Sequence, residues 1–158
     1  ELYQLNQARF LLGESIEYLR ETKEVFDVGI ASGILYHMAN PVELLALLAQ
    51  RCRAVFLWTV FYDPAFYERF PEKKATFSPP EPVNFGDFQH QVHRHHYGEA
   101  LDWNGFCGGA QPYCHWLERD DILGALAHFG LKRQAFFTTE NVHATALQAV
   151  AMREEPRT

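Results

Sequence analysis

The stretch FDVGIASGILYHMANPVELL, residues 26–45, decides the fold expected of this chain. Its first seven residues, 26–32, form an apolar run that predicts a buried strand, covered on both faces. Small residues and a Tyr-His pair follow. Asn40 is a favourable N-cap and Pro41 suits the first helical position, so a helix is expected next. The segment therefore predicts a strand whose carboxyl end lies close to the start of a helix.

Hydrophobic periodicity predicts further strands and helices on both sides of this stretch. The expected strands are residues 8–12, 54–61, 132–139 and 144–152, and the expected helices are residues 13–22 and 118–129. Gly130 suits the end of the second helix, residues 140–143 join an antiparallel strand pair, and residues 153–158 are expected to fray. Strands that alternate with helices predict an α/β fold with a mostly parallel sheet, in which ligands bind beyond the carboxyl ends of the strands.

Residues 62–116 interrupt this alternation. They are rich in Pro, Gly, His and aromatic residues and have no sustained period. The segment is too aromatic for a disordered linker, and a long irregular insertion in a compact domain is usually functional. We expect it to form a lid or substrate-binding insertion over the carboxyl edge of the sheet.

Composition excludes several classes of partner. The formal net charge is −6 and no Lys/Arg stripe is present, so no nucleic-acid partner is expected. No apolar segment has the length that a bilayer requires and no signal peptide is visible, so no membrane partner is expected. The three cysteines have no framework spacing, which fits a reducing compartment and a cytoplasmic location.

Residues 26–45 resemble the fourth strand and following helix of class I S-adenosylmethionine-dependent methyltransferases. The shared features are a strand that begins Phe-Asp, a turn of small residues, a Leu-x-His motif and an Asn-Pro helix start. ARFLLGESIEYL, residues 8–19, resembles the third strand and acidic turn of that family, and residues 54–61 resemble its fifth strand. Residues 116–139 and 144–152 resemble its last helix and terminal antiparallel strands.

The resemblance implies a Rossmann-like α/β fold with the sheet order 3-2-1-4-5-7-6. The mostly parallel sheet would have a terminal antiparallel strand and would lack the N-terminal strands of the fold, since the Gly-rich loop and strands one and two should precede residue 1. Residues 1–158 are therefore interpreted as a partial methyltransferase domain. Without the neighbouring strands, backbone N–H and C=O groups of the remaining strands would be left unpaired. This favours a homodimer or association with the missing N-terminal half.

S-adenosyl-L-methionine is the cofactor that the resemblance implies. The cofactor-binding residues carried over from the family are Gly13, Glu14, Ser15, Ser32, Gly33 and Leu35. An acceptor-only carboxylate at Glu14 would suit the exocyclic amine of adenine. The alternative for residues 13–15 is an exposed helix cap, and the alternative for residues 31–37 is a strand exit with a buried histidine.

His37 is the first candidate for a general base, followed by His95 and His96 from the insertion, because imidazole titrates near neutral pH. A base is needed only if the acceptor must lose a proton. Aromatic and histidine side chains near the expected pocket form the candidate substrate-binding set: Tyr36, Trp58, Tyr62, Trp103, Tyr113, His115 and Trp116. The alternative for residues 102–116 is a packed loop held by its tryptophans.

The predicted function is in-line methyl transfer to a small-molecule acceptor. One alternative is a non-catalytic α/β fragment or partner subunit without the cofactor-binding half. Another is a metal-dependent enzyme that uses His93, His95, His96, Cys107, Cys114 and His115. No metal is expected, because the cysteine and histidine spacings match no common zinc site.

Overall fold

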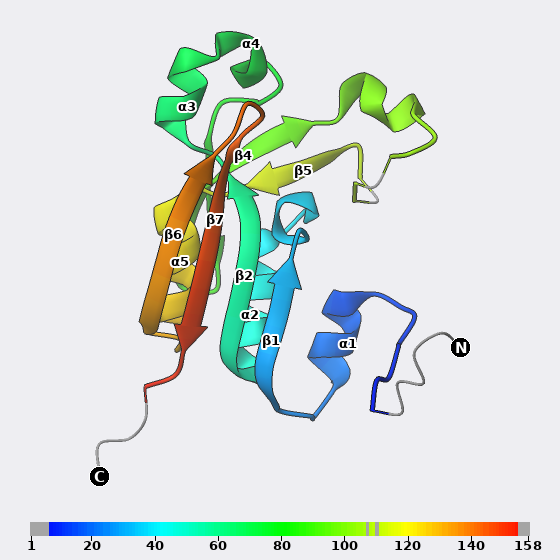
Figure 1. Cartoon of the computed structure of the whole chain (residues 1–158), viewed down its shortest axis with the longest axis vertical. Coiled ribbons are helices and arrows are strands. Elements are labelled where there is room, and N and C mark those ends of the chain that lie inside the picture. Colours follow the sequence, from blue (N-terminus) through cyan, green and yellow to red (C-terminus); the bar gives the residue numbers. More distant parts are fainter. Residues whose placement is uncertain (1–6, 107, 110, 155–158) are drawn as a thin grey trace.

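The computed structural model describes residues 7–106, 108–109 and 111–154, and its main sheet has four strands in the order β1-β2-β7-β6 (Figure 1). The strands are β1 (Phe26–Ser32), β2 (Cys52–Phe61), β6 (Arg133–Glu140) and β7 (Thr145–Met152). β1 pairs with β2 in parallel, whereas the β2–β7 and β6–β7 pairs are antiparallel. The α/β class and the terminal antiparallel strand pair are confirmed, and the parallel part of the sheet is limited to β1 and β2.

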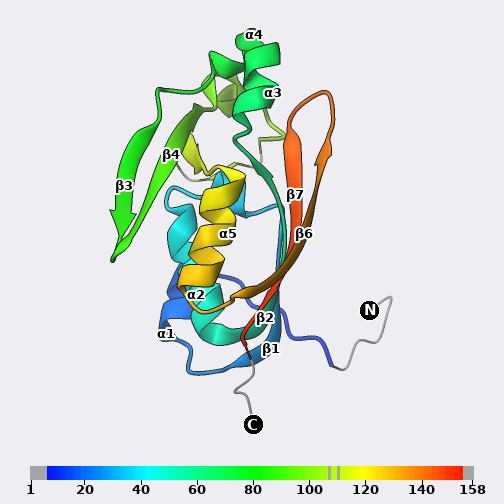
Figure 2. The ribbon, with the colours of Figure 1, turned by 90° about the vertical axis from the view of Figure 1, so that its left-hand side faces the viewer.

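All the helices beside this sheet lie on one of its faces (Figure 2). They are α1 (Ser15–Glu21), α2 (Pro41–Arg51) and α5 (Arg119–His128). α2 begins as expected, because the Asn40 side chain accepts a hydrogen bond from the Glu43 backbone N–H. α5 is followed by Gly130, whose φ of 107° explains the glycine there. The core between helices and sheet includes Leu45 and Leu57, which are fully buried.

The opposite face of the sheet carries exposed apolar side chains. Val28 and Ile30 of β1 are 57% and 73% exposed, and Phe56 of β2 and Val150 of β7 are also exposed. Ile30, Phe56 and Val150 occupy paired positions, so they form a row across three strands. The expectation that residues 26–32 are covered on both faces is therefore wrong, because the helices of the described residues pack on one face only.

Residues 8–12 form no strand, which contradicts the sequence-based expectation. Phe10 and Leu12 are 85% and 106% exposed, so the apolar run has no packing partner among the described residues. At the other end, residues 155–158 of the expected fraying tail lie outside the described residues. Arg153 is ordered, because its backbone N–H donates to the Arg53 carbonyl and its guanidinium contacts the Ala49 carbonyl.

The insertion is more regular than its sequence indicates. It contains α3 (Pro64–Arg69), α4 (Pro71–Lys74) and a 3₁₀ turn, η2 (Gly98–Asp102), together with a three-stranded antiparallel sheet. The strands of that sheet are β3 (Glu81–Phe85), β4 (Phe88–His96) and β5 (Tyr113–Trp116). Figure 1 shows β4, β5 and α3 beyond the carboxyl ends of β1 and β2. No helix among the described residues has the length and apolar character that crossing a membrane would require.

Substitution of Leu57 by Ala should lower the free energy of unfolding by about 2–5 kcal/mol, because it leaves a cavity between the sheet and its helices. Ile30→Ala, on the open face of the same sheet, should cost less than about 1 kcal/mol. Urea unfolding followed by circular dichroism measures both. Equal losses would contradict the assignment of the core to the helix-covered face.

Candidate functional site

A tight turn at the carboxyl end of β1 positions the candidate site. The Gly33 N–H donates to the Trp58 carbonyl at 2.9 Å, and the φ of Gly33 is 73°, which favours glycine. The 3₁₀ turn η1 (Leu35–His37) follows. Leu35 is only 2% exposed and anchors η1 in the core. As a result, His37 at the end of η1 lies beside the first turn of α2.

His37 lines a cavity of about 310 Å³. Glu14 contributes from the start of α1 and Tyr113 from β5, so three of the predicted site residues converge here from separate elements. The remaining lining residues are Ile16, Met38, Ala39, Asn40, Glu43, Gly109 and Gln111. The acidic turn, the carboxyl end of β1 and the insertion therefore meet at one cavity.

The imidazole of His37 is held by the insertion. Its Nδ1 atom lies 3.4 Å from the hydroxyl of Tyr97, and that hydroxyl accepts a hydrogen bond from the Gly109 N–H at 3.2 Å. The Tyr36 ring packs beside it, with the ring centroids 4.2 Å apart. Burial lowers the pKa of His37, so the neutral ring is favoured at neutral pH.

A cluster of aromatic side chains packs next to His37. Tyr36 makes edge contacts with Trp58 of β2 and Trp116 of β5, at centroid distances of 6.3 and 5.9 Å. These three belong to the predicted substrate-binding set, and the fold brings them together. None of them lines the 310 Å³ cavity itself. Trp58 and Trp116 pack against Tyr36, which in turn packs against His37.

The two other candidate bases, His95 and His96, differ in burial and in orientation. His95 stacks on Trp116, and its pKa falls to about 4 because of burial, with smaller contributions from His96 and His37. His96 is the next residue of β4 and is exposed, and its Nε2 atom lies 2.8 Å from the Ser78 hydroxyl. Adjacent strand residues point to opposite faces, so the fold brings His95 toward His37 and turns His96 away.

His115 connects the insertion to the site. Its backbone N–H donates to the Met38 carbonyl at 3.0 Å, and its ring Nδ1 lies 2.7 Å from the Ala39 carbonyl. Arg94 approaches Nε2 at 3.4 Å, so both contacts fit a ring that carries its proton on Nδ1. His115 thus holds residues 38–39 in place. Trp103, by contrast, is 67% exposed and does not line the cavity.

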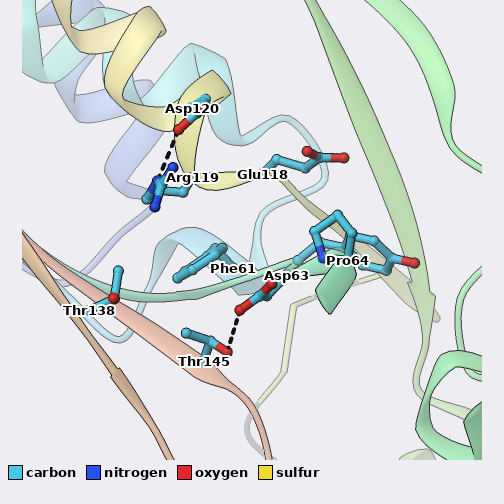
Figure 3. A pocket seen from close by; sticks show the side chains of 9 residues that line it. Phe61, Asp63, Pro64, Glu118, Arg119, Asp120, Thr138 and Thr145 are labelled. Atoms are coloured by element: carbon cyan, nitrogen blue, oxygen red, sulfur yellow. Dashed lines mark hydrogen bonds and ion pairs between the residues drawn. The ribbon is translucent and has the colours of Figure 1, made fainter. Parts of the chain in front are cut away.

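Tyr62 lines a second, smaller cavity of about 160 Å³ (Figure 3). Its ring stacks on His93 with the centroids 3.5 Å apart. The polar groups around this cavity bind one another: the Asp63 carboxylate accepts from the Thr145 hydroxyl at 2.9 Å, and Arg119 pairs with Asp120. This arrangement joins α3 to β7, and Tyr62 does not line the cavity that His37 lines.

The predicted cofactor residues are only partly at the cavity. Glu14 lines it, whereas Gly13, Ser15, Ser32 and Gly33 do not, and Leu35 is in the core. Sequence reasoning missed Tyr97 and Gly109, which contact His37. A side chain added at Gly109 would lie 2.5 Å from the His37 carbonyl oxygen, so the close approach requires glycine.

Among residues 7–106, 108–109 and 111–154, no three His, Cys, Asp or Glu side chains are placed to hold a metal ion. Cys107, one of the possible ligands considered from the sequence, lies outside the described residues. Burial raises the pKa of the Cys114 thiol, and the nearby Tyr97 and Trp116 side chains partly offset this effect. His93, buried on β4, contacts Glu118 at 3.1 Å.

Comparisons with known proteins find this fold in several solved structures. The crystal structure of the N-terminal domain of EvdMO1 with SAH bound matches at a TM-score of 0.59 and 17% identity, covering 87% of this chain and 51% of that one. The same domain in the presence of SAH and D-fucose matches equally, covering 52% of its length. The chain thus shares this fold and spans about half of the matched chains. No protein-family model and no curated protein matches it.

Buried histidines predict a loss of stability in acid. The pKa of His95 is about 4 in the folded chain and about 6.5 when unfolded, so the unfolded chain binds more protons between these values. The free energy of unfolding should therefore fall as pH is lowered from about 6.5 to about 4. His95→Asn should flatten that slope in urea unfolding across this window. An unchanged slope would exclude His95 as a contributor.

Proposed function

We propose that this chain is the C-terminal part of an S-adenosylmethionine-dependent methyltransferase that acts on a small hydroxylated acceptor. The observation that carries the proposal is the convergence of Glu14, His37 and Tyr113 on one cavity beyond the carboxyl ends of the parallel strands. This is where α/β proteins bind ligands. The matched EvdMO1 domain, whose crystal structure holds SAH, adds support at the level of the fold.

The charges around the cavity suit a cationic methyl donor. Its described lining residues include the carboxylates of Glu14 and Glu43 but no Lys or Arg, although Arg20 pairs with Glu43 from outside. His37 adds no positive charge while it is neutral. The surroundings are therefore negative or neutral, which favours a sulfonium ion over an anion.

The residues fit one end of the donor. Glu14 is an acceptor-only group, which suits the exocyclic amine of an adenine, and the backbone N–H of Ser15 follows it. Ser32 and Gly33, which the resemblance also assigns to the cofactor, lie outside the cavity wall. Binding of the donor by this chain alone should therefore be weak.

When bound, the donor supplies an electrophilic methyl group: the acceptor oxygen forms the new bond to carbon while the carbon–sulfur pair passes to sulfur. The role proposed for His37 is to accept the hydroxyl proton at a ring nitrogen, which leaves neutral ether and imidazolium. Its lowered pKa keeps the accepting form populated at neutral pH. His95, beside it but largely buried, is a less accessible second candidate.

The acceptor is proposed to be a small molecule with a hydroxyl group on an apolar or ring-shaped body. Tyr113 and Met38 offer apolar surface at the cavity, and Glu14 and Gln111 offer polar contacts. D-fucose is a reasonable first probe, because one of the matched EvdMO1 structures was determined in its presence.

A non-catalytic partner subunit is the second candidate function. Within the described residues, β1 pairs only with β2, so its other edge has unpaired backbone groups. Unpaired edges favour strand addition by another chain. Association through this edge, as a homodimer or with a segment that carries the Gly-rich loop, is proposed under both candidate functions.

Methyl transfer is tested with an isotope-labelled donor, D-fucose and a panel of other hydroxylated small molecules. His37→Gln should lower kcat at least about 100-fold, because a positioned general base contributes on that scale. Circular dichroism checks that the variant folds. Turnover unchanged by His37→Gln would remove the histidine from the mechanism. No transfer to any acceptor, when a segment that carries the Gly-rich loop is supplied together with this chain, would favour the partner-subunit alternative.

Nucleoside binding is tested separately by calorimetry with S-adenosylhomocysteine. Glu14→Gln should weaken binding about fivefold, because a charge-assisted hydrogen bond to the adenine amine becomes a weaker neutral one. Glu17→Gln is the matched control, because Glu17 is an exposed carboxylate in the same helix and does not line the cavity. Equal effects of both substitutions would show that Glu14 acts through general charge and not through a specific contact.

A further inference from the structure

We infer that Arg94 is a positioning residue that fixes one wall of the 310 Å³ cavity from outside it. Arg94 lies on β4, the central strand of the insertion sheet, and does not itself line the cavity. Its guanidinium contacts Tyr113, which lines the cavity, and His115, which holds residues 38–39. These contacts stand on the geometry of the chain, whereas their consequence for methyl transfer rests on the proposed function.

The register of the insertion sheet gives Arg94 access to both neighbouring strands. Arg94 and His115 are paired residues of β4 and β5, so their side chains lie on the same face of the sheet. Tyr113 is two residues from His115 on β5, and Glu81 of β3 pairs with Val92, two residues from Arg94. Both are therefore diagonal neighbours of Arg94, and one side chain can contact all three strands.

The contacts use the distinct features of a guanidinium group. The Nε–H of Arg94 donates to Nε2 of His115 at 3.4 Å, and the central carbon of the group lies over the Tyr113 ring, 4.8 Å from its centroid. A carboxylate oxygen of Glu81 lies 3.7 Å from a terminal nitrogen and partly offsets the positive charge. Arginine combines a planar fork of donors with a face that stacks on aromatic rings, and lysine has no such planar group.

The two contacts of the His115 ring assign its proton. The Ala39 carbonyl can only accept, so Nδ1, which lies 2.7 Å from it, carries the proton. The Nε–H of Arg94 can only donate, so Nε2 is the nitrogen that accepts. In this arrangement the imidazole ring links the guanidinium of Arg94 to the Ala39 carbonyl.

The wall held in this way lies beside the candidate base. Met38 and Ala39 line the cavity and directly follow His37. The backbone N–H of His115 also donates to the Met38 carbonyl, at 3.0 Å. Loss of the guanidinium would leave the His115 ring free to turn, so the wall next to His37 would be less well fixed. The cost should therefore fall on the alignment of the reacting groups more than on affinity for the donor.

The contact is measured from the exchange with water of the Arg94 Nε–H in ¹H–¹⁵N spectra, and Arg94→Lys identifies the signal. The hydrogen bond to His115 should slow this exchange about tenfold relative to that of Arg9, which is exposed. His115→Phe should abolish the slowing, because a phenyl ring has no acceptor. His128→Phe is the matched control, since His128 is a histidine of α5 that contacts Asp87.

Equal exchange at Arg94 and Arg9 in the wild-type protein overturns the inference, and so does slowing that survives His115→Phe. If His115→Phe does not fold, the wild-type protein still decides the matter through two-bond ¹H–¹⁵N spectra of its histidine rings. These should show the proton of His115 on Nδ1. A proton on Nε2 would leave Arg94 without its acceptor and would overturn the inference.

Where methyl transfer is detected, Arg94→Lys should lower kcat about tenfold and change KM for the donor less than about twofold. Arg119→Lys should change neither, because Arg119 lies over Phe136 and pairs with Asp120 outside this cavity. The double variant Arg94→Lys/His115→Phe should lose less than the product of the single fold-changes, since the two share one contact.

An unchanged kcat in Arg94→Lys, or single effects that multiply fully in the double variant, would contradict the positioning role. Absence of methyl transfer would refute the proposed function but would leave the exchange result standing.

Discussion

The hydrogen bond from Gly33 to the Trp58 carbonyl is the constraint on which the site depends. It continues the β1–β2 ladder by one residue and then sends the chain into a turn that glycine allows, with φ at 73°. Leu35 fixes the next turn by burial, and Asn40 caps α2. Between these two fixed points only a few residues remain, so His37 has little freedom in where it lies.

The insertion fixes the same segment from its other side. β5 hydrogen-bonds to residues 38 and 39 through the backbone and ring of His115, while Tyr97 and Gly109 contact His37. These contacts join residues 60 or more positions apart in the sequence. The site is therefore formed by the meeting of two sheets, and either sheet alone would present only part of it.

The sequence predicts the segment 26–45 well because its signals are local: an apolar run, a glycine, an Asn-Pro cap. It fails at residues 8–12, where an apolar run has no ladder partner among the described residues. The hairpin of β3 and β4 had a usable signal, since Gly86-Asp87 is a two-residue turn between segments in which apolar and polar residues alternate, and the φ of Gly86 is 61°. No pattern in the sequence indicated Tyr97, because its contact with His37 depends on how the insertion folds back onto the carboxyl end of β1.

The buried histidines are unfavourable to protonate, so their presence calls for an explanation. Burial lowers the pKa of His37, His90, His93 and His95, so each favours the neutral form and is expensive to charge. A structural role alone would be served as well by apolar residues of similar size. Neutral imidazoles differ from these in that they accept protons, and unlike Lys or Arg they do not repel a cation. In the proposed reaction a sulfonium donor must approach a hydroxyl whose proton needs an acceptor, and His37, which shares its cavity with two carboxylates, meets both requirements.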